Sequence, residues 1–82
     1  MDKIDQLREE IDFIDDTIME LLEKRYTISI QIGNLKKEHN ISVLDQNREE
    51  IILKKASKHS HYPSIESVYR SIMEESKKLQ RK

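Results

Sequence analysis

Two cations lie on the same side of an otherwise apolar helical stripe in the first half of the chain. Arg25 is in the middle of the stripe, and Lys36 follows eleven residues later, close to three helical turns, so both project to one side. A planar guanidinium that binds carboxylates in a bidentate manner, next to a point-charge ammonium, indicates a site for an anion. The structural alternative is that Arg25 pairs with a buried glutamate or extends to solvent.

The second half of the chain carries further polar residues at helical spacing. Asp45, Arg48 and Glu49 stand at i, i+3 and i+4, so they share one face of a helical turn, although such triplets are also common on solvated helices. Ser76 and Gln80 are four residues apart and extend an apolar stripe, which therefore becomes polar at its end. A stripe of this kind either reaches solvent or lines a site.

A third arginine lies nearer the N-terminus. Arg8 precedes Arg25 by seventeen residues, which puts it on a different side of the same helix. Arg8 cannot easily serve a pocket at Arg25 within one chain, but it could serve the pocket of a partner whose first helix runs antiparallel. The simpler alternative is an exposed Arg8 in a surface salt bridge.

Several kinds of chemistry have no support in the sequence. His59 and His61 could bind a metal only with a third ligand, and none is near them. The chain has no cysteine, Gly-rich phosphate loop or Ser-His-Asp arrangement. We therefore expect chemistry that needs no nucleophile, metal or cofactor.

The composition narrows the class of partner. Lys and Arg number 15 against 16 Asp and Glu, a net charge of −1, which argues against nucleic-acid binding through a clustered basic face. No apolar run approaches the ~20 residues of a membrane span, and the start, MDKIDQLREE, does not resemble a signal peptide. We expect a cytoplasmic protein with no membrane or nucleic-acid partner.

The candidate residues require helices to position them, and the longest predicted helix covers 4–36. Its seam has alternating spacings of three and four, typical of a heptad pattern, and nine of its ten positions are apolar. The seam consists of Ile4, Leu7, Ile11, Ile14, Ile18, Leu21, Arg25, Ile28, Ile32 and Leu35. Gly33, the chain's only glycine, lies inside this predicted helix and indicates close approach of a backbone or ligand. We place the helix end near 37–39, with Asn40 in the left-handed conformation.

Two shorter helices are predicted after a connector at 39–44. The first covers about 45–58, and Ser42 with Asp45 resembles a capping box at its start. A turn at 59–63 follows, and Ser64 is expected to cap a helix that runs to about Leu79. The predicted fold class is thus all-α, with one long and two short helices in a single domain, 1–82.

The long helix implies a partner. At about 1.5 Å per residue, its seam spans roughly 50 Å, more than the roughly 25–30 Å diameter of a compact domain of this size. The two shorter helices can cover only part of that seam. With 35% hydrophobic and 38% charged residues, the core of one chain is also lean. We expect an intertwined homodimer with two-fold symmetry.

Five short motifs follow one another across nearly the whole chain. They are L-R-E-x-I-D-x-I-D at 7–15, L-L-E-K-R at 21–25, I-G-N-L-K at 32–36, V-L-D-Q-N-R-E at 43–49 and I-M-E-E-S-K-K-L-Q at 72–80. Their order and spacing together are specific, and they resemble the all-α, intertwined dimeric class of chorismate mutase. Because the chain stops soon after Gln80, we expect a monofunctional enzyme with no fused domain.

The resemblance implies a role for each charged candidate. Arg8 would enter the partner's pocket and, with Arg25 of the other chain, would hold the two carboxylates of chorismate. Arg48 and Ser76 would assist them. Lys36 corresponds to the lysine that meets the ether oxygen of the substrate.

The remaining positions complete the implied site. Glu49, and Asp45 through its backbone, would meet the ring hydroxyl, while Lys36 and Gln80 would both donate to the ether oxygen. The implied apolar lining consists of Ile11, Ile32, Ile72 and Met73. Every polar position expected from the family has a match in this sequence.

The implied reaction is the Claisen rearrangement of chorismate to prephenate, the entry to phenylalanine and tyrosine biosynthesis. One alternative is an isochorismate pyruvate lyase, which shares the fold but lacks the acidic pair, so Asp45 and Glu49 favour the mutase. Another is a noncatalytic regulatory or coiled-coil module. The complete polar set argues against that, because a packing module has little need for Arg25 on the seam.

Overall fold

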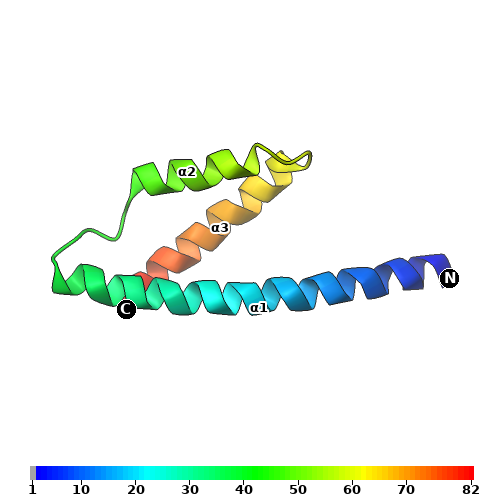
Figure 1. Ribbon diagram of the computed structural model, residues 1–82, viewed down its shortest axis with the longest axis horizontal. Helices are drawn as coiled ribbons and strands as arrows, with labels where there is room; N and C mark the ends of the chain where they lie inside the picture. The colour runs from blue at the N-terminus through cyan, green and yellow to red at the C-terminus, as the bar shows by residue number, and fades with distance from the viewer. Residues whose placement is uncertain (1) are drawn as a thin grey trace.

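The computed structural model describes residues 2–82, and within that range the chain forms three α-helices and no strand (Figure 1). The helices are α1 (Asp2–Glu38), α2 (Gln46–Ala56) and α3 (Tyr62–Gln80). This confirms the predicted all-α fold with one long helix followed by two shorter ones. No helix in the described range combines the length and hydropathy needed to cross a bilayer.

Helix α1 ends where the sequence predicts. Asn40 has a positive φ of 55°, and its N–H donates to the carbonyl of Lys37 at 3.3 Å. The N–H of Ile41 reaches back to the carbonyl of Lys36 at 2.8 Å. These two bonds form a Schellman motif, which satisfies the last carbonyls of α1 and turns the chain back along the helix.

The two shorter helices are capped by residues other than those predicted. The cap of α2 is Asp45, whose side chain accepts from the N–H of Arg48 at 3.0 Å, so the prediction of Ser42 as the cap is wrong. In α3, Pro63 belongs to the first turn and Ser64 lies inside the helix. Proline fits there because the first N–H groups of a helix have no partner within it. The N–H of Ser64 donates to the carbonyl of His61, which caps the helix through its backbone alone.

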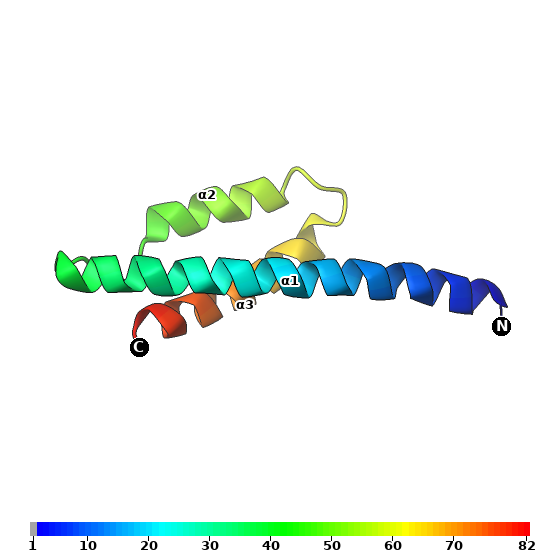
Figure 2. The same ribbon diagram turned by 60° about the horizontal axis from the view of Figure 1, so that its bottom comes forward.

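The third helix joins the other two. It packs against α1 and against α2, whereas α1 and α2 make no close backbone approach to each other in the described range. Two views show α3 crossing from the end of α2 to the C-terminal half of α1, while the N-terminal part of α1 extends alone (Figures 1 and 2). Packing is therefore concentrated at one end of the long helix.

Most of the apolar seam of α1 is not covered by this chain. Its nine apolar residues are between 42% and 57% exposed, and within residues 2–82 only Ala56 and Met73 are buried apolar residues. The surface area is 6994 Å², against about 5,200 Å² expected for a folded monomer of this mass. The radius of gyration is 16.0 Å, against about 12 Å for a compact domain of this length.

The glycine of α1 marks the closest approach of two helices. A Cβ atom on Gly33 would lie 2.6 Å from both the Cα and the carbonyl oxygen of Gln80, the last residue of α3. Side-chain atoms do not approach backbone so closely without a shift. The absence of a side chain at Gly33 therefore allows the end of α3 to rest on α1.

This contact gives a prediction for Gly33→Ala. Alanine favours a helix interior over glycine by about 1 kcal/mol, but overpacking a tight contact costs about 1–3 kcal/mol. We expect Gly33→Ala to lower the Tm by several degrees in thermal unfolding followed by circular dichroism. Asn34→Ala, at an exposed position on the same helix, is the matched control and should leave the Tm unchanged or raise it. A higher Tm for Gly33→Ala than for the parent would contradict the tight contact between Gly33 and Gln80.

Candidate functional site

A cavity of about 400 Å³ lies between the C-terminal half of α1, the connector, α2 and α3. This volume suits a small organic ligand. The cavity is lined by seven of the eight polar residues predicted from the sequence, namely Arg25, Lys36, Asp45, Arg48, Glu49, Ser76 and Gln80. Residues that are up to 55 positions apart in the chain are thus gathered at one site.

The eighth predicted residue, Arg8, does not line this cavity. It is exposed on the extending part of α1, about 25 Å along the helix from Arg25 at 1.5 Å per residue. This agrees with the expectation that Arg8 cannot serve the pocket of its own chain. Its expected role in a partner's pocket stays a prediction.

The seam arginine is held by α3 and not by an acidic side chain. Nη1 of Arg25 donates to Oγ of Ser76 at 2.6 Å, and the guanidinium lies 6.0 Å from the centre of the Tyr69 ring. Oγ of Ser76 in turn donates to the carbonyl of Ile72 at 2.9 Å. A guanidinium has five N–H donors, so the bond to Ser76 leaves donors for a carboxylate ligand.

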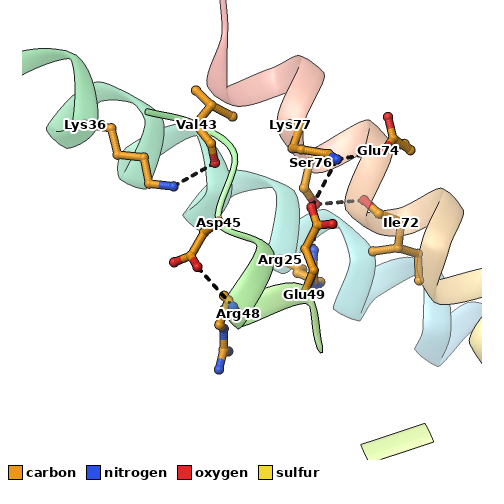
Figure 3. A network of polar contacts seen from close by, with 10 residues as sticks. All are labelled: Arg25, Lys36, Val43, Asp45, Arg48, Glu49, Ile72, Glu74, Ser76 and Lys77. Carbon is orange, nitrogen blue, oxygen red and sulfur yellow. Dashed lines mark hydrogen bonds and ion pairs between the residues drawn. The ribbon is translucent and has the colours of Figure 1, made fainter. Parts of the chain in front are cut away.

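The connector positions the cavity's lysine. Nζ of Lys36 donates to the carbonyl of Val43 at 2.9 Å (Figure 3). The turn at Asn40 brings Val43 back beside the last turns of α1. An ammonium has three donors, so Lys36 is held at the cavity wall and can still donate to a ligand.

The start of α2 supplies a cation and two carboxyl groups. Because the Asp45 side chain caps the helix, its carboxylate is engaged by the N–H of Arg48. The side chain of Arg48 is exposed at the cavity rim, and Glu49 is half-buried. Figure 3 shows the three residues following one another along the first turn of α2.

One cation of the cavity, Lys77, was not predicted from the sequence. Its Nζ lies 3.0 Å from Oε2 of Glu49 on α2 and 2.7 Å from Oε1 of Glu74 on α3. The bonds from Glu74 and then from Glu49 raise the pKa of Lys77 above its usual value, and the same ammonium lowers the pKa of the Glu74 carboxyl. Lys77 therefore stays charged at neutral pH. Its position between Ser76 and Gln80 was the signal available in the sequence.

The end of α3 presents an amide without a partner. Oε1 of Gln80 is buried and has no hydrogen-bond partner among residues 2–82. An unpaired buried acceptor costs about 1–3 kcal/mol, so such a group is rare outside sites that receive a ligand or water. Rotation of the amide can also turn its N–H donors to a ligand.

The apolar lining agrees with the prediction in part. Ile32 and Met73 line the cavity, together with Ile28 and Ile52. Ile72 instead supplies the carbonyl that accepts from Ser76.

The fourth predicted lining residue, Ile11, is exposed on the extending part of α1 and is not in the cavity of its own chain.

The electrostatics of the cavity favour an anion. Four cationic side chains line it against two carboxylates, and Lys77 neutralises one of these. The described range contains no group of side chains suited to hold a metal ion. What the arrangement offers a ligand is a set of N–H donors, from Arg25, Lys36, Arg48 and Gln80, of which Arg25 and Lys36 are held by hydrogen bonds.

The chain matches a family model and solved structures. Residues 7–81 match the family model described as chorismate mutase type II. A conserved hypothetical protein from Pyrococcus furiosus is 38% identical, with 95% of each chain covered and a TM-score of 0.85. No curated protein matches the chain.

Proposed function

The chain belongs to the chorismate mutase type II family, and we propose that it catalyses the Claisen rearrangement of chorismate to prephenate. The observation that carries this proposal is the gathering of Arg25, Lys36, Arg48 and Gln80 around one cavity of suitable volume. Chorismate is a dicarboxylate with an ether oxygen, so it needs cations for two carboxylates and donors for the ether. Prephenate would supply phenylalanine and tyrosine biosynthesis.

The reaction suits a site without a nucleophile. It is unimolecular and pericyclic, so it requires neither proton transfer nor a covalent intermediate. The protein has to hold the compact diaxial conformer of chorismate, which is an effect of orientation. It also has to place donors where charge develops. A millionfold acceleration corresponds to roughly 8 kcal/mol, a magnitude that orientation and two fixed donors can supply.

We assign the donors by their positions in the cavity. Arg25, braced by Ser76, would bind one carboxylate, and Arg48 at the rim would assist. Lys36 and the amide N–H of Gln80 would donate to the ether oxygen, where negative charge grows as the C–O bond breaks.

The two acidic residues would meet the ring hydroxyl. Glu49 would accept directly from this hydroxyl. Asp45 uses its carboxylate as the cap of α2, so it would contribute through its backbone.

We further propose that the site is completed by a second copy of the chain. An antiparallel partner would bring its Arg8 level with Arg25 if the two-fold axis crosses α1 near residues 16–17, midway between them. The surface excess of about 1,800 Å² per chain corresponds to about 3,600 Å² in a dimer, which is in the range of obligate homodimers. The partner's Arg8 would then hold the second carboxylate.

The proposal is tested by parallel assays with two substrates. We expect prephenate from chorismate and no pyruvate from isochorismate, because Asp45 and Glu49 form the acidic pair that the lyases lack. Pyruvate release from isochorismate as the main activity would replace the mutase assignment with a lyase. Turnover of neither substrate by the folded dimer would indicate a noncatalytic module.

A second prediction concerns the charge state of the donor at position 80. A neutral amide donates at any ordinary pH, whereas the carboxyl of Gln80→Glu donates only when protonated. We expect kcat/KM of Gln80→Glu to fall by about 10²-fold as pH rises through the pKa of that carboxyl, and to recover in acid.

The parent enzyme and Gln31→Glu, at an exposed position of α1, are the controls and should keep flat profiles from mildly acidic to neutral pH. The measurement is kcat/KM for chorismate against pH, within the range where circular dichroism shows every protein folded. Parallel profiles for Gln80→Glu and the parent would remove Gln80 from the transition state.

A further inference from the structure

One cation of the cavity has no role in the proposed reaction. Lys77 has a side chain only 13% exposed, and it lines the same cavity as Lys36 and Gln80. Its neighbour Lys78 is 65% exposed, pairs with Glu75 on the same helix and does not line the cavity. The two adjacent lysines therefore have different surroundings, and only Lys77 is directed to the site.

The contacts of Lys77 link the cavity wall to α2. Its ammonium lies between two carboxylates, Glu49 at 3.0 Å and Glu74 at 2.7 Å (Figure 3). Within residues 2–82 the pair with Glu49 is the ion pair that joins α2 to α3. Lys77 binds Oε2 of Glu49, so Oε1 stays available to a ligand in the cavity.

We propose that Lys77 is a positioning residue that holds the Glu49 carboxylate in the orientation in which it accepts from the ring hydroxyl of the substrate. This inference rests on the proposed mutase function and adds a residue to it. The chemistry is that of a charge-assisted hydrogen bond, which fixes one carboxylate oxygen and directs the other. Lys77 acts through Glu49 and does not itself contact the substrate.

The position of Glu74 strengthens this argument. Glu49 and Glu74 are both within 3.0 Å of one ammonium, so their carboxylates face the same point in space. Without the ammonium, two like charges would be left close together and would repel each other. Removal of Lys77 should therefore release the Glu49 carboxylate and also repel it from the orientation in which it faces the ring hydroxyl.

Two other roles for Lys77 make different predictions. A tether between α2 and α3 would act through the same pair with Glu49, but its loss would lower the Tm, which a positioning role does not require. If Lys77 bound the substrate directly, the decrease in kcat/KM from its loss would add to the decrease from the loss of Glu49. Only a residue that acts through Glu49 becomes dispensable once Glu49 is changed.

The test is a double-mutant cycle on the full chain with chorismate as substrate. Lys77→Met keeps the apolar stem and removes the charge, and we expect it to lower kcat/KM about tenfold, within the range for coupled residues in contact. In the Glu49→Gln background the same change should have almost no further effect. Lys77→Arg should recover most of the activity, and Lys78→Met, the matched control, should retain parental kcat/KM.

The outcomes separate this inference from the mutase proposal. Mutase activity of the parent chain tests the proposed function. The double-mutant cycle then compares each variant's kcat/KM with that of the parent. Equal losses for Lys77→Met in the parent and Glu49→Gln backgrounds would overturn the positioning role. Parental activity of Lys77→Met would do the same. Thermal unfolding of each variant shows whether a loss of activity reflects a loss of fold. If Lys77→Met does not fold, Lys77→Arg replaces it in the cycle.

Discussion

The structure depends on a mismatch in length between one helix and the two that pack on it. α1 has 37 residues, whereas α2 and α3 have 11 and 19, and both lie toward the C-terminal end of α1. The apolar seam of α1 therefore stays about half-exposed along its whole length. The hydrophobic effect makes such exposure unfavourable, at about 25 cal/mol per Å². The candidate site forms where α2 and α3 lie beside α1, and the exposed seam is where we propose that a partner binds.

Local backbone chemistry then decides how accurately the site is assembled. The left-handed Asn40 turns the connector back, so that its Val43 carbonyl meets Lys36. Gly33 lets the end of α3 lie directly on α1, which brings Gln80 into the cavity. Three segments that are far apart in sequence thus place donors around one volume.

The sequence predicted those parts that local periodicity or turn chemistry determines. The seam of α1, the left-handed Asn40 and the tight contact at Gly33 all follow from residue type and spacing, and the structure agrees. The caps of α2 and α3 were predicted less well, because neighbouring polar residues compete to cap a helix with small differences in free energy. Asp45 caps α2 in place of Ser42.

Tertiary packing determines the parts that the sequence could not show. Lys77 and Lys78 both lie between Ser76 and Gln80, and the approach of α2 places Glu49 beside Lys77. The bond from Arg25 to Ser76 likewise requires α3 to pack on α1. Motif order identified both residues of that bond as site residues, but not that they bind each other.

The central claim is that each site combines the cavity of one chain with Arg8 of another, and mixing two inactive variants tests it most directly. Arg8→Ala and Lys36→Ala should each lose about 10²-fold or more in kcat/KM. In a heterodimer of the two, one site would have both Arg8 and Lys36 intact, so unfolding and refolding an equal mixture should restore about a quarter of parental activity. A mixture as inactive as its components, although heterodimers form, would contradict the shared site.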